Sequence, residues 1–401
     1  MAIQVATKYN VGGVLLDRPF KVRRLGHFGF NVSKVEECTR FYTDLLGFKI
    51  SDEGPMGAGY FMRFGGDHHA FAMFSKDAVE ARARANPNAA RHMKPDNTIN
   101  QITWQTQSLS EPVDAIDYLI ERGIQIGRIG RDGAGSNWAT YFLDPDGHTN
   151  ELYYGIEQIG WDGRSKPAEY RRPEAGKIDL PRKSEFEEVN ESLETTGVAT
   201  NSGFRYVDNM PAIYNLGGIM LGRPFRMVKH GPVNIFVEDV ARSRDFYIDN
   251  VGFVVTEEVT WQGEKCVFLR CNTEHHSLAL FPRSWRDRLG LSDHTSSMSF
   301  GVQVANYQQL KDAVAFLREH GVRVETNLIP PELYPGIDYS AHCFDPDGHC
   351  IQLYYYMEQV GWDGRTRTRA ERRSVDPNAW PDTVQPLCDT FGGESFLGPW
   401  G

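Results

Sequence analysis

Apolar residues recur at helical spacing between Val35 and Leu46, and Gly47 follows as a stop signal, so this segment is predicted to be a helix. A loosely alternating stretch before it predicts a strand at 27–32. Three short apolar stretches after it predict strands at 48–51, 59–64 and 70–74. The pattern of this region is therefore strand, helix and three strands, a βαβββ module.

The same order of elements occurs a second time before residue 155. A strand is predicted at 102–106, a helix at 111–122 that ends before Gly123, and strands at 124–129, 139–144 and 149–154, with a turn at 144–147. Two such modules, placed side by side, would form a mixed sheet that curves around a cleft, where ligands commonly bind.

The whole two-module unit is duplicated along the chain. Phe41-Tyr42 recurs as Phe246-Tyr247, a displacement of 205 positions (246 − 41 = 205), and the segment 144–148, Asp-Pro-Asp-Gly-His, recurs at 345–349, a displacement of 201 (345 − 144 = 201). The fold class is therefore α+β, with four modules in two halves. The expected boundaries are a first half at 1–164, a surface connector with one short helix at 165–209, a second half at 210–365 and a C-terminal tail at 366–401.

Composition and charge narrow the range of partners. The chain has 401 residues and a net charge of −10 without a long basic cluster, which argues against nucleic acid and anionic membranes as partners. Its six cysteines form no CxxC pair and are expected to be reduced thiols. Residues 1–10 lack the apolar core of a signal peptide, and no apolar run has the length of a membrane span, so a soluble cytoplasmic protein is expected.

Several landmarks resemble the vicinal oxygen chelate superfamily, which includes glyoxalase I, bleomycin-resistance proteins and type I extradiol dioxygenases. They are Gly26-His27, the helix end at 46–48, and the turn at 144–147 followed by Glu151-Leu152-Tyr153. The resemblance covers roughly residues 20–164 and 225–365, and it implies the paired-module fold that the hydrophobic pattern also predicts.

Within that superfamily the chain is most similar to the extradiol, catechol 2,3-dioxygenase-like enzymes. The similarity is carried by the His68-His69 pair before an apolar strand, and by Gly130-Arg131-Asp132 and Tyr141 upstream of the turn. It implies a metal held by His27, Gln101 and Glu151, with His69 as the acid–base residue, Tyr141 placing a substrate oxygen and Asp132 helping to orient the substrate. Fe(II) is the metal implied first, and Mn(II), Zn(II) and Ni(II) are alternatives.

The chain departs from the extradiol pattern at two of these positions. Gln101 stands where those enzymes have their second histidine ligand, and Asp132 stands where they have a signature histidine. An amide is a weaker ligand, and a strand amide that merely hydrogen-bonds inside the cleft is an equally apt interpretation of Gln101. The more oxygen-rich ligand set would lower the affinity for iron and would favour a non-redox metal.

The second half has lost the implied ligands. The positions that correspond to His27, Gln101, Glu151 and Tyr141 hold Pro232, Ser299, Gln352 and His342, although His276 retains the position of the acid–base histidine. We therefore expect at most one metal site per chain, in the first half, with the second half serving as a structural lid or a dimerisation partner. His148 and His349, which follow the repeated turn, are expected to be turn residues.

Three functions are consistent with these residues. The first is extradiol-type cleavage of a catechol-like aromatic at a mononuclear metal, with a small aromatic substrate and O2 as partners in a homo-oligomer. The second is a non-oxidative, metal-dependent lyase or isomerase of glyoxalase type. The third is a protein that binds an aromatic small molecule without catalysis. Metal content distinguishes the third function from the other two, and O2 uptake distinguishes the first from the second.

Overall fold

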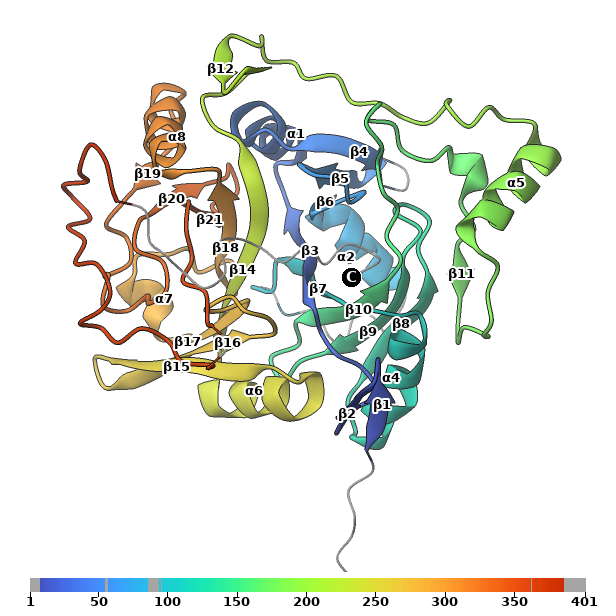
Figure 1. Cartoon of the computed structure of the whole chain (residues 1–401), viewed down its shortest axis with the longest axis horizontal. Coiled ribbons are helices and arrows are strands. Elements are labelled where there is room, and N and C mark those ends of the chain that lie inside the picture. Colours follow the sequence, from blue (N-terminus) through green and yellow to red (C-terminus); the bar gives the residue numbers. More distant parts are fainter. Residues whose placement is uncertain (1–7, 55–56, 86–93, 95, 362, 386–401) are drawn as a thin grey trace, which may run out of the picture.

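A computed structural model describes residues 8–54, 57–85, 94, 96–361 and 363–385 (Figure 1). Two large mixed sheets, one in each half of the chain, pack against each other, as the duplicated modules predict. No helix within the described ranges is both long enough and apolar enough to cross a membrane. Five of the cysteines are free thiols, and the sixth, Cys388, lies outside the described residues.

The first sheet contains nine strands in the order β11-β8-β9-β10-β7-β3-β6-β5-β4. The central strands β3 and β7 are the first strands of the two modules, and they pair antiparallel, while β6 is parallel to β3 and β10 is parallel to β7. The strands are β3 (Arg24–Val32), β4 (Lys49–Glu53), β5 (Gly59–Arg63), β6 (Phe71–Ser75), β7 (Ile99–Gln105), β8 (Ile126–Arg131), β9 (Trp138–Leu143), β10 (Thr149–Tyr154) and β11 (Glu174–Ala175).

The second sheet contains eight strands in the order β15-β16-β17-β14-β18-β21-β20-β19, which repeats the topology of the first. They are β14 (Met227–Val237), β15 (Val254–Trp261), β16 (Glu264–Arg270), β17 (Leu278–Pro282), β18 (Ser297–Val304), β19 (Val324–Glu325), β20 (Ser340–Phe344) and β21 (Cys350–Tyr354). Each half also begins with a short hairpin, β1 (Tyr9–Val11) with β2 (Val14–Leu16) and β12 (Tyr214–Leu216) with β13 (Ile219–Leu221).

Both predicted helices of the first half are present. The first is α1 (Val35–Arg40), continued by one π-helical turn, η1 (Phe41–Leu46), and it ends at Gly47 in the left-handed conformation. The second is α4 (Ser110–Glu121). Their counterparts are α6 (Val240–Phe246) with η4 (Tyr247–Val251), and α8 (Tyr307–Glu319). In the described ranges, two further α-helices were not predicted, α2 (Lys76–Ala85) and the short α7 (Trp285–Arg288).

The connector contains the one helix that was expected, α5 (Glu185–Thr196), which begins with a capping box at Ser184 and Glu187. It also contains a 3-10 turn, η3 (Ala168–Tyr170), and the edge strand β11. An ion pair of 2.8 Å between Arg131 and Glu188 ties α5 to the first sheet. The connector therefore packs onto the first half as part of its surface.

The central strand β3 is buried on both faces, and its successive side chains point alternately to one face of the sheet and to the other. Phe28 and Phe30 point toward the second half, where Phe28 stacks on Phe300 with ring centroids 4.7 Å apart. His27 lies on the opposite face together with Gly29. The apolar face thus forms the core between the two halves, and the other face is left for polar side chains.

The repeated Asp-Pro-Asp-Gly-His turns form contacts between the halves, which the sequence did not reveal. Asp144 accepts a hydrogen bond from the Tyr247 hydroxyl at 2.9 Å, and His148 Nε2 lies 2.9 Å from Ser296 Oγ. The second turn makes the reciprocal contacts, from Asp345 to Tyr42 at 3.0 Å and from His349 to Thr98 at 2.9 Å. The two histidines are therefore buried interface residues and not simply parts of a turn.

Candidate metal and substrate site

Three neighbouring strands place polar side chains in a row on the face of the first sheet that points away from the second half. Thr103 on β7 lies directly opposite His27 on β3, and Glu151 on β10 lies directly beside Thr103. Residues in register on adjacent strands point to the same side of a sheet. The strand pairing therefore brings His27, Thr103 and Glu151 together, although the first and the last are 124 positions apart (151 − 27 = 124).

The Glu151 carboxylate is fully buried and is the centre of this group. Its Oε2 lies 3.3 Å from His27 Nε2 and accepts a hydrogen bond of 3.0 Å from the Thr103 hydroxyl. Its Oε1 accepts a hydrogen bond of 2.8 Å from Asn137 Nδ2. A buried carboxylate requires such partners, or a cation, to offset the loss of hydration.

Gln101 is on the same face of β7 as Thr103 but two residues away, opposite Gly29. It is thus a diagonal neighbour of His27, at a distance that long side chains can span. A side chain at Gly29 would meet the Ala72 carbonyl oxygen at 2.9 Å, and Gln101 lines the adjacent cavity. The structure places all three implied ligands on one face, but it shows direct contact only between His27 and Glu151.

A first-row metal fits this donor set. Two ligands on one such ion, with bonds of about 2.1 Å, lie about 3.0 to 3.4 Å apart, and His27 Nε2 and Glu151 Oε2 are separated by 3.3 Å. Among the described residues no three His, Cys, Asp or Glu side chains form a metal-binding group, so the third protein donor would be the Gln101 amide. His27 Nδ1 is buried without a hydrogen-bond partner in the described part of the chain.

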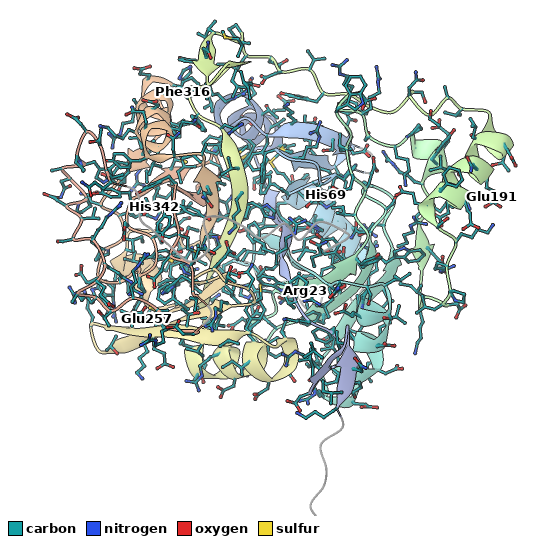
Figure 2. The ribbon with its side chains drawn as sticks, viewed as in Figure 1. Arg23, His69, Glu191, Glu257, Phe316 and His342 are labelled. Carbon is teal, nitrogen blue, oxygen red and sulfur yellow. The ribbon has the colours of Figure 1, made fainter. Side chains whose placement is uncertain are left out.

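His69 lies next to His27, with ring centroids 4.2 Å apart, and its ring is also 4.9 Å from that of Phe61. Burial, reinforced by the neighbouring His27, holds the pKa of His69 well below its usual value. The imidazole is therefore neutral at neutral pH and is able to accept a proton. In Figure 2, His69 is labelled in the first half, near its sheet.

Tyr141, Asp132 and Arg128 form a second polar group that lines the same cavity as His69. The Tyr141 hydroxyl donates to Asp132 Oδ2 at 3.1 Å and accepts from Arg128 at 2.8 Å, and Arg128 also forms an ion pair with Asp132. Asn137 donates to Asp132 at 3.2 Å as well as to Glu151, so a chain of hydrogen bonds joins this group to the metal-ligand candidates.

The pKa directions in this group are consistent with a hydrogen-bond donor at Tyr141. Burial, with added repulsion from Asp132 and Glu151, raises the pKa of Tyr141 well above its usual value. Burial also raises the pKa of Asp132, against the opposing influence of Arg128. Tyr141 therefore keeps its proton at neutral pH and presents a neutral hydroxyl to the cavity.

The cavity in front of these residues has a volume of about 590 Å³, within the range of small-molecule sites. Its wall combines the aromatic rings of Phe61 and Phe74 with charged side chains from α2, β8 and the connector. Among the residues that line it are His69, Arg82, Gln101, Arg128, Asp132, Gly133, Tyr141 and Arg171.

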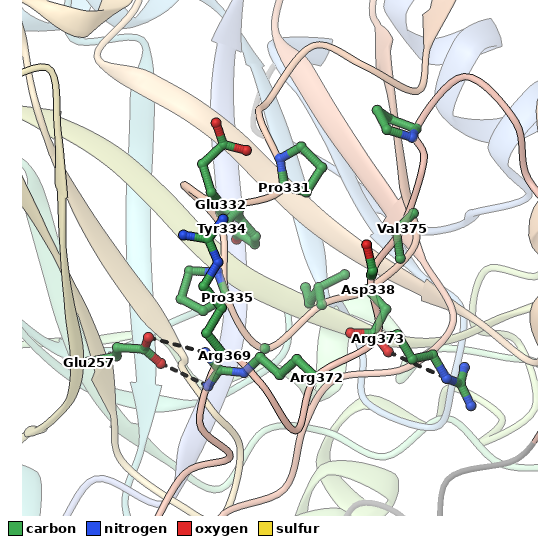
Figure 3. A pocket seen from close by; sticks show the side chains of 14 residues that line it. Glu257, Pro331, Glu332, Tyr334, Pro335, Asp338, Arg369, Arg372, Arg373 and Val375 are labelled. Carbon is green, nitrogen blue, oxygen red and sulfur yellow. Dashed lines mark hydrogen bonds and ion pairs between the residues drawn. The ribbon is translucent and has the colours of Figure 1, made fainter.

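The corresponding region of the second half is filled by a tyrosine. The Tyr334 hydroxyl lies 2.9 Å from His276 Nε2, 3.1 Å from Gln352 Oε1 and 2.9 Å from Asn234 Oδ1. The position opposite Gln352 is Gly301, where a side chain would collide with the backbone of Gly231. A separate cavity of about 410 Å³ lies around Tyr334, Arg369 and Arg372, and neither His276 nor Gln352 lines it (Figure 3).

Sequence reasoning missed Thr103, Asn137 and Arg128. Thr103 and Asn137 contact Glu151 only because of strand register and loop shape, which a single sequence does not specify. The Arg128–Asp132 pair had a detectable signal, because the two residues are four apart and alternate residues of a strand share a face.

Comparisons with known proteins identify the fold of both halves. The model of the Glyoxalase/Bleomycin resistance protein/Dioxygenase superfamily matches residues 24–152 and 229–353. A 2,2',3-trihydroxybiphenyl dioxygenase from Sphingomonas paucimobilis is 24% identical over 131 residues, which are 33% of this chain and 42% of that relative. The match thus spans less than half of the relative's length.

Solved structures resemble the chain over most of its length. The 2,3-dioxygenase LapB from Pseudomonas sp. KL28 superposes with a TM-score of 0.57 at 15% identity, covering 86% of this chain and 95% of that one. A Mn(II)-bound glyoxalase from Novosphingobium aromaticivorans superposes with a TM-score of 0.54 at 16% identity, covering 86% of each chain. Likeness at these identities concerns the fold.

Proposed function

The chain belongs to the Glyoxalase/Bleomycin resistance protein/Dioxygenase superfamily, and on that premise we propose that it is an extradiol-type dioxygenase that cleaves a catechol-like aromatic substrate. The observation that carries this proposal is the neutral, buried His69, which lies against the metal-ligand candidate His27 and lines the cavity. An extradiol reaction requires a base of this kind beside the metal, because the catechol must lose protons as it binds.

One metal ion, Fe(II) in this proposal, would be held by His27, Glu151 and Gln101. When bound, it would supply coordination for the two phenolic oxygens and for O2. Thr103 and Asn137 hold the Glu151 carboxylate in place through both of its oxygens. Fixing a ligand in this way is the task that outer hydrogen bonds perform at metal sites.

The remaining side chains would act on the substrate directly. His69 accepts a phenolic proton, and the Tyr141 hydroxyl turns its single proton from Asp132 to a substrate oxygen. Arg128 and Asp132 fix the position of the Tyr141 hydroxyl. Phe61 and Phe74 provide apolar contact for an aromatic ring within the cavity.

The test measures metal content by plasma mass spectrometry on anaerobically purified protein, together with O2 uptake on a panel of small catechols. We expect about one iron per chain and catechol-dependent uptake. His69→Gln should retain the metal and lower uptake at least about 100-fold, whereas the matched variant His276→Gln should leave uptake unchanged. Iron without any uptake across the panel would contradict the proposal.

A second function is favoured by one observation, the amide of Gln101 in place of a histidine ligand. It is a non-oxidative, glyoxalase-type proton transfer in which His69 is again the base and a non-redox metal serves as a Lewis acid. Zinc, manganese or nickel in the purified protein, with no O2 uptake, would support it. Protein that binds no metal under any of these conditions would instead support a non-catalytic binding function.

A further inference from the structure

Four side chains lie in a line that ends at His69. In order they are Arg171, Asp52, His68 and His69. His68 Nδ1 lies 3.0 Å from His69 Nδ1, and His68 Nε2 lies 3.4 Å from Asp52 Oδ2 on β4. Asp52 also forms an ion pair with Arg171 of the connector. Both histidines are fully buried, and Asp52 is nearly so.

The second half contains the same line. Arg372 binds Glu257 at 2.8 Å, Glu257 Oε2 lies 3.1 Å from His275 Nε2, and His275 Nδ1 lies 2.9 Å from His276 Nδ1 (Figure 3 shows the Arg372–Glu257 contact). Glu257 is the repeat equivalent of Asp52 (52 + 205 = 257), and Arg372 that of Arg171 (171 + 201 = 372). The duplication thus reproduces the whole line, including a cation from outside the expected module boundaries.

The contacts along this line indicate where each proton lies. His68 Nε2 has no hydrogen-bond partner among the described residues and lies 3.4 Å from the Asp52 carboxylate, which can only accept, so we place the His68 proton on Nε2, and this leaves its Nδ1 as an acceptor. The Nδ1 of His69, which faces that acceptor, must then donate. An imidazole with its single proton on Nδ1 has an unprotonated Nε2, and His69 lines the cavity.

We propose that Asp52 is a positioning residue, which acts through His68 to hold His69 in the Nδ1-protonated tautomer so that a bare Nε2 faces the substrate cavity. The importance of this tautomer for catalysis rests on the function proposed above, whereas the tautomer itself does not. Arg171 keeps the Asp52 carboxylate directed at His68, and in this way a connector residue contributes to the site.

Besides their carboxylates, Asp52 and Glu257, the two lines differ in where they end. In the second half, His276 Nε2 is 2.9 Å from the Tyr334 hydroxyl, so this ring nitrogen faces a buried phenol. In the first half the residue equivalent to Tyr334 is Gly133 (334 − 201 = 133), and the cavity takes the place of the phenol ring. The first half thus has space beside its terminal histidine where the second half has a phenol.

The test reads the tautomers directly, by two-bond ¹H–¹⁵N correlation spectra of the full chain labelled with ¹⁵N-histidine and supplied with diamagnetic Zn(II). In the unmodified chain we expect His69 to be protonated at Nδ1 and His68 at Nε2. Asp52→Leu removes the acceptor and leaves the Arg171 cation near His68, so the expected result is a reversal of both tautomers. Asp52→Glu, the residue that the second half uses, should preserve the original pattern.

The matched control is Glu257→Leu, which should change the signals of His275 and His276 but not those of the first pair. A His69 that is protonated at Nε2 in the unmodified chain would overturn the proposal, and so would an unchanged His69 tautomer in a folded Asp52→Leu variant. If Asp52→Leu fails to fold, the spectrum of the unmodified chain still decides.

Activity provides a second and separate readout. O2 uptake with a catechol should fall about 100-fold in Asp52→Leu and should recover in Asp52→Glu. An unmodified chain with no uptake would contradict the proposed dioxygenase activity, while the tautomer measurement would still stand. A reversed tautomer with full uptake would overturn the role of Nε2 as the base.

Discussion

The two halves share strand order, helices and even the line of histidines, yet only the first keeps an open site. At the place where the first half brings together His27, Thr103 and Glu151, the second has Pro232, Gly301 and Gln352. The Tyr334 ring then occupies the volume in front of them. The difference shows that the same paired-module half accommodates either a polar site with a cavity or a plug, the buried Tyr334 side chain in contact with His276 and Gln352.

The substitutions with the largest expected effect test whether metal binds only in the first half. Glu151→Ala removes the buried carboxylate, so metal binding should be abolished, and the same loss is expected for His27→Ala. Gln352→Ala, the matched change in the second half, should leave the metal content unaltered. Plasma mass spectrometry on the purified variants measures this, and retention of metal in both first-half variants would refute the assignment of the ligands.

Removal of the plug should mainly affect stability. Tyr334→Ala empties a fully buried ring position and leaves His276 and Gln352 without their partner. We expect a loss of about 3–5 kcal/mol in the free energy of unfolding, measured by urea denaturation, and no gain of metal binding. A second metal ion in this variant would show that Tyr334, and not the absence of the ligands, prevents the second half from binding metal.

The reciprocal change should close the first site. A side chain at Gly133 would meet no atom within 4 Å at its Cβ, so Gly133→Tyr is expected to fold and to place a phenol beside His69. We expect metal to be retained and kcat/KM to fall about 100-fold, a change of about 2.7 kcal/mol. Gly133→Ala is the control and should bind substrate normally.

The smallest expected effect concerns the interface between the halves and its dependence on pH. Burial opposes protonation of His148, but the adjacent Asp144 carboxylate outweighs it and raises the pKa of His148. The contribution of protonated His148 to the free energy of unfolding is therefore complete below its unfolded-state pKa of about 6.5. It is lost as pH rises through the higher folded-state pKa. Urea unfolding between pH 6 and 9 should show this decline in the unmodified chain and a smaller one in Asp144→Asn.

Much of the fold was predictable because the hydrophobic period changed from strand to helix and back in the same order twice. The elements that were missed, such as α2 and α7, are additions to the βαβββ pattern, although each follows an equivalent strand, β6 or β17. The candidate site was only partly predictable. His27 and Glu151 stood out as polar residues in apolar strands, whereas Thr103 depends on the register between β3, β7 and β10, which pairs residues far apart in the sequence.

The repeat also continues farther than its obvious landmarks. Arg171 and Arg372 belong to Arg-Arg pairs displaced by 201 positions, and their carboxylate partners show that they are equivalent. That signal was present in the sequence but looked like unrelated basic residues beyond the expected boundaries at 164 and 365. The ion pairs with Asp52 and Glu257 show that these arginines occupy equivalent positions in the two halves.

The reciprocal turns at Asp144 and Asp345 have a consequence for the assembly of the molecule. Each half contributes a tyrosine and a hydroxyl to the turn of the other, which is the self-complementary exchange of an isologous two-fold dimer. Because both halves belong to one chain, this contact is intramolecular and does not depend on protein concentration. The pairing of the halves therefore does not require both of them to carry the same polar site.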